Sequence, residues 1–249
     1  MTYLSRIRLN PQRAQARRFL SDPQVLHAAV LAGIPRQPVS ERVLWRLDAD
    51  EPLRPHLLVL TASAPSWEHL VEQAGWPSAD DPEDPQVLVR PYETLLDRLQ
   101  AGQRYVFRLR ANPVTATKDP KRLTAAQRNK LENGEATRSR RVAHRTVEHQ
   151  MGWLLERTAR LGFSIPAASS TEAMQEAVPD VRIIDRSRLQ FSKRGSKGRI
   201  TIQTVTFEGH LVIEDVERFR EVLTDGVGRA KAYGCGLLTL APAGEPVER

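Results

Sequence analysis

His27 is the residue whose type and position most directly indicate chemistry. It lies one turn inside a predicted helix that Asp22 caps and Pro23 begins. Imidazole titrates near neutral pH, so this side chain can give or accept a proton under cellular conditions. A packed or surface histidine has the same sequence signature, and His27 alone does not distinguish the two interpretations.

The histidines and the cysteine do not form the pattern of a metal site. His144 and His149 are five residues apart and do not share a helix face, unlike the i, i+4 pair of a two-histidine zinc site. Cys235 is the only cysteine, which excludes an intrachain disulfide and a cysteine-based zinc site. The sequence also contains no P-loop and no serine nucleophile elbow. We therefore predict no metal and no cofactor.

A glycine-rich segment with two cations precedes a predicted strand near the C-terminus. Glycines allow backbone N–H groups to approach a phosphate closely, and neighbouring cations supply charge. The same glycines would equally suit a turn that needs positive φ angles. The candidate phosphate-binding residues are Gly226, Gly228, Arg229, Lys231, Gly234 and Gly236.

The positive charge of the chain is concentrated in two segments. The formal net charge is +7, and residues 104–145 carry 12 basic and 3 acidic side chains. Residues 186–199 form a second cluster of six cations with no acidic residue among them. One basic run is often only a solvated connector, but two acid-poor clusters favour nucleic acid as the partner. A membrane surface is disfavoured because neither cluster adjoins a bulky apolar helical face.

Apolar segments of the length that membranes require are missing from the sequence. No apolar run approaches the roughly 18 residues that span a bilayer. Residues 1–10 alternate between apolar and polar side chains and show no apolar core of a secretory signal. We expect a cytoplasmic protein without a membrane partner.

The order of predicted elements is β-α-β-β-α-β, and it occurs twice. In the first half, strands are predicted over 3–9, 43–47, 56–61 and 104–110, with helices over 23–31 and 66–73. In the second half, the elements are 140–144, 146–161, 181–191, 199–207, 214–223 and 236–240, with a basic-tipped hairpin between the third and fourth. This is the ferredoxin-like pattern. We predict an α+β fold with two tandem ferredoxin-like domains, 1–115 and 138–249, joined by a basic linker or loop over 116–137.

Several motifs occur in a fixed order along nearly the whole chain. They are Tyr-Leu-Ser-Arg-Ile-Arg-Leu-Asn at 3–10, His27, Leu-Trp-Arg-Leu-Asp at 44–48, Arg-Leu-Arg-Ala-Asn-Pro at 108–113, Phe-Glu-Gly at 207–209 and the glycine-rich run 226–238. In this order they resemble the CasE family, the pre-crRNA-processing endoribonucleases of type I-E CRISPR systems. The resemblance spans residues 3–242, although the segments 80–97 and 118–137 match only in their spacing.

The resemblance implies two ferredoxin-like, RRM-related domains and cleavage of CRISPR repeat RNA at the base of its stem-loop. It implies a metal-independent reaction in which the substrate 2′-OH attacks phosphorus and leaves a 2′,3′-cyclic phosphate and a 5′-OH. His27 matches the catalytic histidine of the family, and the protein would stay on the crRNA with other Cascade subunits. The implied RNA-binding residues are Arg108, Arg110, Arg188, Lys193, Arg194, Lys197 and Arg199, together with the glycine-rich segment.

Gln24 departs from the family pattern, which often has a tyrosine three residues before the histidine. An amide can hydrogen-bond a phosphate oxygen but cannot transfer a proton near neutral pH. One alternative is therefore a repeat-RNA-binding scaffold that cleaves weakly or not at all. A DNA-binding or membrane-surface protein is a further alternative, but it rests on charge alone and does not account for the ordered motifs.

Overall fold

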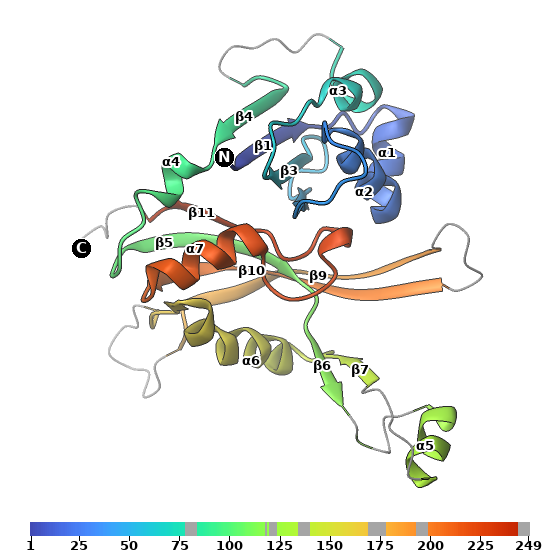
Figure 1. Cartoon of the computed structure of the whole chain (residues 1–249), viewed down its shortest axis with the longest axis vertical. Helices are drawn as coiled ribbons and strands as arrows, with labels where there is room; N and C mark the ends of the chain where they lie inside the picture. The colour runs from blue at the N-terminus through green and yellow to red at the C-terminus, as the bar shows by residue number, and fades with distance from the viewer. Residues whose placement is uncertain are drawn as a thin grey trace.

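The computed structural model describes residues 1–77, 84–117, 119, 124–133, 140–168, 178–192 and 199–243. Figure 1 shows three parts: a first sheet with its helices at the top, a second sheet across the middle, and a two-stranded ribbon with a short helix projecting at the bottom. Among the described residues, no helix is long and apolar enough to cross a membrane.

The first sheet is antiparallel and has the strand order β2-β3-β1-β4. This is the order that a β-α-β-β-α-β unit takes when it forms a ferredoxin-like sheet. Alternating side chains of its strands face the core, as in the pattern of β1, where Ser5 and Ile7 are buried. Its elements are β1 (Tyr3–Arg8), α1 (Ala14–Ser21), α2 (Pro23–Ala32), β2 (Leu44–Asp48), β3 (His56–Thr61), α3 (Glu68–Ala74) and β4 (Val87–Pro91).

The second sheet repeats this topology. Its order is β11-β5-β10-β8, and β9 also pairs with β10 in a long antiparallel ladder. The elements are α4 (Glu93–Leu96), β5 (Arg104–Ala111), α6 (Val147–Thr158), η2 (Ala159–Leu161), β8 (Phe163–Ser164), β9 (Val181–Ser192), β10 (Arg199–Ile213), α7 (Val216–Asp225), η3 (Lys231–Tyr233) and β11 (Leu238–Pro242). The predicted α+β fold with two ferredoxin-like units is confirmed.

One strand belongs to a different sheet than predicted. The segment 104–110 forms β5, but β5 pairs with β10 and β11 of the second sheet, so the prediction that it completes the first sheet is wrong. The fourth strand of the first sheet is β4, which follows an acidic, proline-rich segment and is short. The sheets therefore divide between Pro91 and Arg104 rather than at residue 115.

The strand predicted at 140–144 also lies outside the second sheet. It forms β7 (Arg140–Ala143), which pairs with β6 (Val114–Thr117) in a separate two-stranded ribbon. α5 (Ala125–Glu132) lies beyond this ribbon in Figure 1. The described part of the predicted linker 116–137 thus contains the end of β6 and a helix.

One of the two hydrophobic clusters extends across both sheets. Leu44 and Leu60 of the first sheet pack in the same buried cluster as Phe107 and Leu238 of the second. A charged side chain adds to this contact. Arg46 of β2 is 2% exposed, ion-pairs with Asp48, and donates hydrogen bonds to the carbonyl oxygens of Arg108 and Leu237, 2.8 and 3.3 Å away. The relative position of the two sheets is therefore fixed by both packing and polar contacts.

Candidate functional site

His27 is half-buried on α2, and its ring is held by a tryptophan of the neighbouring sheet. Asp22 caps this helix by accepting hydrogen bonds from the Gln24 and Val25 backbone N–H groups, as predicted. The indole Nε1–H of Trp45, which is 1% exposed, donates to His27 Nδ1 over 3.3 Å. An indole can only donate, so the neutral imidazole carries its own proton on Nε2. Burial lowers the pKa of His27, and the indole contact also favours the uncharged ring.

The glycine-rich segment packs against the elements that carry His27 and Trp45. η3 lies against α2 and β2. Gly234 has φ 77° and sits on the Trp45 ring, where a Cβ atom would lie 2.6 Å from Cζ3. Only glycine meets both requirements at this position. The turn interpretation therefore explains Gly234, and contact of the other glycines with phosphate stays a prediction.

Lys231 is the first residue of η3, which packs against α2. The pKa of its ammonium is lowered by burial and by the nearby positive charge of Arg42. A partly buried ammonium beside a second cation is favourable for an anionic ligand, because the ligand relieves both the repulsion and the lost hydration. Gln24 lies one helical turn before His27 and is also half-buried.

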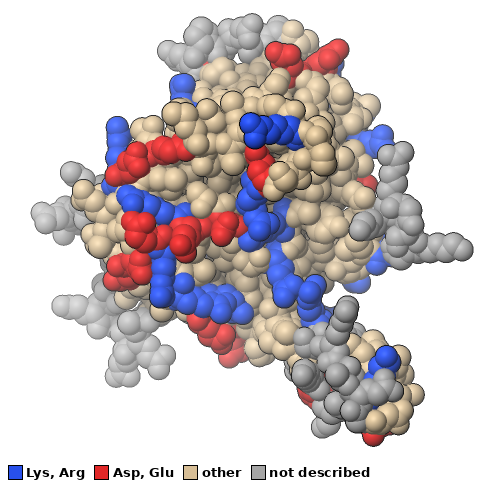
Figure 2. All heavy atoms as spheres, in the orientation of Figure 1, with Lys and Arg blue, Asp and Glu red and all other residues tan. Residues whose placement is uncertain are grey.

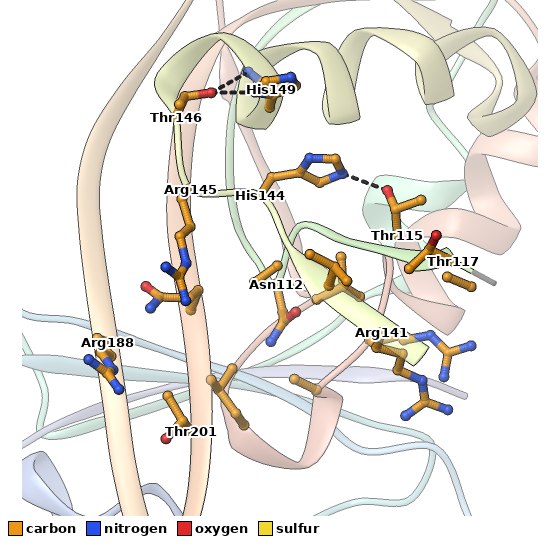
Figure 3. Close-up of a pocket in the computed structure, with 18 of the residues that line it drawn as sticks. Asn112, Thr115, Thr117, Arg141, His144, Arg145, Thr146, His149, Arg188 and Thr201 are labelled. Carbon is orange, nitrogen blue, oxygen red and sulfur yellow. Dashed lines mark hydrogen bonds between the residues drawn. The ribbon is translucent and has the colours of Figure 1, made fainter. Parts of the chain in front are cut away.

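A groove of about 910 Å³ adjoins η3 on the side of the two-stranded ribbon. Its walls come from β6, β7, the start of α6, β9, β10 and the loop before η3 (Figure 3). None of the described residues that line it is acidic. We call it the basic groove and define it by its cationic and titratable lining residues, Arg141, His144, Arg145, His149, Arg188 and Arg229.

The two histidines of the basic groove are oriented by threonines. Their rings stack with centroids 5.9 Å apart and planes at 20°. His144 Nε2 lies 2.6 Å from Thr115 Oγ1, and His149 Nδ1 hydrogen-bonds Thr146 Oγ1, the N-cap oxygen of α6. These contacts hold two flat rings side by side at the edge of the groove (Figure 3).

A second cleft, of about 690 Å³, lies between the two sheets. Arg108 lines it, but its guanidinium donates to Glu208 over 2.6 and 3.0 Å and also pairs with Asp50. Arg182 donates to the other Glu208 oxygen over 2.7 Å, and these hydrogen bonds lower the pKa of Glu208. We call this the charge-paired cleft and define its charged residues as Asp48, Asp50, Arg108, Arg110, Arg182, Asp185 and Glu208.

The structure separates the predicted RNA-binding arginines into two groups. Arg188 and Arg229 line the basic groove, whereas Arg108 and Arg110 line the charge-paired cleft. Arg199 is exposed at the start of β10 and lines neither site. Lys193, Arg194 and Lys197 lie outside the described residues.

Sequence reasoning missed several residues of the groove. Arg141 and Arg145 were part of the basic run, but nothing in their spacing placed them opposite β9. Asn112 is 7% exposed, lines the groove, and its Oδ1 has no hydrogen-bond partner. The sequence feature that could have identified Asn112 was its position near the end of the motif at 108–113. The described ranges contain no cluster of three or more His, Cys, Asp or Glu side chains that could hold a metal ion.

Figure 2 shows how charge is distributed on one face of the molecule. Lys and Arg side chains extend from the middle of this face toward the α5 arm at the lower right. At the left of the same face, basic and acidic side chains lie next to one another. A continuous cationic path of this kind suits a polyanion, and an alternating one is largely self-neutralised.

Comparisons with known proteins place this geometry in a family. The family model described as "CRISPR associated protein" matches residues 2–242. "CRISPR-associated endoribonuclease Cse3" from Thermus thermophilus is 32% identical over 247 residues, covering 96% of this chain and 100% of that protein. "Structure of Thermus Thermophilus Cse3 bound to an RNA representing a pre-cleavage complex" aligns with a TM-score of 0.71 over 97% of this chain and 99% of that one, at 32% identity.

A structure from a second organism agrees. "Crystal structure of the CRISPR-associated protein Cas6e from Escherichia coli str. K-12" aligns with a TM-score of 0.61 at 27% identity, covering 97% of this chain and 100% of that chain. The matches extend through both ferredoxin-like units and include the elements that carry His27 and the glycine-rich segment. The chain belongs to the CRISPR associated protein family of Cse3 and Cas6e.

Proposed function

We propose that this protein is an endoribonuclease that cleaves CRISPR repeat RNA at the base of its stem-loop and keeps the product as a subunit of a Cascade complex. The observation that carries the proposal is the hydrogen bond between Trp45 and His27, on a helix that packs against η3. The loop before η3 and Tyr233 also line a groove that has no acidic side chain among its described lining residues. A relative with the same fold is named an endoribonuclease and is known with bound RNA. Both the chemistry and the charge of the site suit that substrate.

The reaction uses a nucleophile that the RNA itself supplies. The 2′ oxygen attacks the adjacent phosphorus, a 2′-O–P bond forms, and the P–O5′ bond breaks. The products are a 2′,3′-cyclic phosphate and a 5′-OH, and no water is consumed. The protein has to move two protons, one away from the 2′-OH and one onto the leaving 5′ oxygen.

His27 takes the role of the base. Its lowered pKa leaves the ring uncharged at neutral pH, which is the form that accepts the 2′-OH proton. The basic atom is Nδ1, because Nε2 already carries the proton of the neutral ring. The Trp45 hydrogen bond to Nδ1 is 3.3 Å long, at the weak end for N–H donors, so the substrate hydroxyl can replace the indole at low cost.

Lys231 supplies the positive charge that the transition state needs. Its segment packs against the helix of His27. The pentavalent phosphorus carries extra negative charge, which a preoriented ammonium stabilises better than water does. Because the pKa of Lys231 is lowered, it also suits the transfer of a proton to the leaving oxygen. Gln24 can add a hydrogen bond to a phosphate oxygen but no proton transfer.

The test is a cleavage assay with the CRISPR repeat RNA of the host, carried out in EDTA. A parallel RNA carries a 2′-deoxy at the scissile nucleotide. Cleavage in EDTA that disappears with the 2′-deoxy RNA supports internal attack without a metal. Cleavage of the 2′-deoxy RNA, or a requirement for added divalent ions, contradicts the mechanism.

The second candidate function is a repeat-RNA-binding scaffold. Gln24 favours it, because a family member that lacks the usual tyrosine has one proton-transfer group fewer. Tight binding of the stem-loop RNA without cleavage in the same assay would select this candidate.

A further inference from the structure

Asn112 is a buried polar group that the fold itself does not satisfy. It follows β5, is 7% exposed, and its Oδ1 accepts no hydrogen bond from any described residue. In Figure 3 its amide faces the same space as the side chains of Arg145 and Arg188. A buried acceptor without a donor is unfavourable, and proteins keep one mainly where a ligand or water supplies the donor. The amide also offers N–H donors, so it matches a partner with both kinds of group.

The groove around Asn112 offers the other contacts of single-stranded RNA. Its described lining residues include four arginines and no acidic side chain, and the arginines provide positive charge for phosphates. The stacked rings of His144 and His149 lie at one part of the rim, and Tyr233 lines another. Aromatic and imidazole faces stack on unpaired bases, and cations track the backbone between them.

The size and depth of the groove favour unpaired nucleotides over a duplex. Its 910 Å³ lies at the upper end of pockets that enclose one small molecule, roughly 300–1,000 Å³. The base edges of an A-form duplex lie in a deep, narrow major groove, where a side chain from a recessed floor does not reach them. A splayed, unstacked base presents its edge freely and can enter such a groove.

The basic groove and the charge-paired cleft meet at Tyr233, which lines both. Tyr233 belongs to η3, which packs against the helix of His27. An RNA strand whose scissile phosphate lies beside η3 would therefore also adjoin the groove. We propose that the basic groove binds unpaired nucleotides that flank the stem-loop, and that Asn112 reads the base of one of them. This inference rests on the proposed function, because it takes the same RNA as the ligand.

The test compares three RNAs, all with a 2′-deoxy at the scissile nucleotide. One is the stem-loop alone, one adds the 5′ flank, and one adds the 3′ flank. Their dissociation constants are measured for the wild-type protein, Asn112→Ala and the double variant Arg145→Ala/Arg229→Ala. The control is Arg90→Ala/Arg98→Ala, which removes the same charge from exposed positions on β4 and after α4.

We expect one flank to tighten wild-type binding about tenfold over the stem-loop alone. The double groove variant loses this gain and lowers the slope of log affinity against log salt by about 1.4, since each single-strand phosphate contact contributes about 0.7. The control keeps the gain, and the stem-loop alone binds the groove variant and the control equally. The 5′ and 3′ arms identify which flank occupies the groove.

Asn112→Ala tests base reading separately from charge. With the tightening flank randomised one position at a time, the wild-type protein prefers one base at one position about tenfold, and the variant loses that preference only. Because Oδ1 makes no hydrogen bond, the variant should unfold at the same temperature as the wild type or higher.

Three results overturn the inference: no flank tightens binding, the groove variants weaken the stem-loop alone as much as flanked RNA, or Asn112→Ala keeps the base preference. Failure of the proposed function looks different, because the wild-type protein then does not cleave the unmodified stem-loop RNA, or does not bind it at all, whichever flank is present.

Discussion

Arginines on the two faces of the β9–β10 ladder have different surroundings. Arg188 and Gln203 point to the basic groove, whereas Ser187 and Glu208 point to the charge-paired cleft. Adjacent residues of a strand face opposite sides, so one hairpin serves both sites. On the groove side, no acidic side chain is among the described lining residues. On the cleft side Glu208 receives two arginines.

The difference shows that the position of an arginine in a basic segment does not determine whether carboxylates neutralise its charge. Arg108 and Arg188 both belong to basic stretches of the sequence, yet Arg108 is neutralised by carboxylates of both sheets. Its charge links the two ferredoxin-like units, whereas the groove arginines line a surface that has no acidic side chain among the described residues. The chemistry, the contact between the sheets and the binding groove can each be disrupted separately.

The largest effect is expected for His27→Ala. Removing the proton-transfer group should lower the cleavage rate by about 10²–10⁴-fold. The groove arginines remain, so the dissociation constant for uncleavable repeat RNA should stay within about twofold of wild type. Single-turnover cleavage and filter binding measure the two quantities. Equal losses in both would mean that His27 supports binding or folding instead of chemistry.

Arg46→Met tests whether the cleft is structural. The change leaves Asp48 and the carbonyl oxygens of Arg108 and Leu237 without their buried donor. We expect the free energy of unfolding to fall by about 3 kcal/mol, as for other broken buried ion pairs. Urea denaturation measures it, with Arg54→Met at an exposed position as the matched control. A loss no larger than that of the control would contradict the role of Arg46 between the sheets.

Trp45→Phe tests the contact that holds the His27 ring. Without the indole donor, protonation of Nδ1 no longer breaks a hydrogen bond, so the pKa of His27 should rise toward 6.5. A base with a higher pKa is protonated over more of the pH range, so the cleavage profile shifts to higher pH and the rate at pH 6 falls several-fold. The profile and an NMR titration of His27 both report the shift.

Trp67→Phe is the matched control for this change. Trp67 is also buried in the first sheet unit, but its Nε1 has no hydrogen-bond partner. Its replacement should leave the pH profile in place. A shift of the same size in both variants would attribute the effect to packing alone.

Glu208→Gln distinguishes the cleft from the groove through acid stability. Hydrogen bonds from Arg182 and Arg108 lower the pKa of Glu208 below its ordinary 4.5. The ionised carboxylate therefore stabilises the fold above that pH, and this stability is lost as the pH falls through the lower, folded-state pKa. The variant should lose about 1 kcal/mol at pH 7, a value reduced by solvent exposure of the pair. The free energies of unfolding of the two proteins, measured by urea denaturation, should differ at pH 7 and approach each other as the pH falls below 4.5.

Gln24→Tyr has the smallest expected effect. If His27 and Lys231 carry proton transfer, restoring the tyrosine usual in the family should change the cleavage rate only a few-fold. Single-turnover rates measure it. A loss as large as that of His27→Ala would show that Gln24 has an essential role, and a gain of the same size would favour the scaffold interpretation of the natural chain.

The sequence predicted the repeated fold because most of its elements carry a local signal, although β4 and α1 were not predicted. Asp22 and Pro23 begin α2, and alternation marks β1, β9 and β10, as observed. The sheet to which β5 belongs was not predictable in this way, because alternation reveals a strand but not its partners. Only the pairing of Arg104–Ala111 with β10 and β11 shows it.

The types of residue that form the site were predictable from the sequence, but their arrangement in space was not. His27 and Gly234 were both identified from the sequence. In the structure both contact Trp45, although they lie 18 and 189 positions away from it in the chain. Nothing in the motif at 44–48 indicated that Trp45 contacts His27. The neutralisation of Arg108 depends on carboxylates of two strands that no local pattern brings together.

The contact of Gly234 with Trp45 also has a consequence for the order of events during synthesis. Domains generally form as they leave the ribosome, so the first sheet with His27 can fold early. The wall that seats Trp45 comes from Gly234, which is 189 residues farther along the chain. The nascent protein therefore completes its candidate active site only after η3 and Gly234 have been translated, long after the first sheet has left the ribosome.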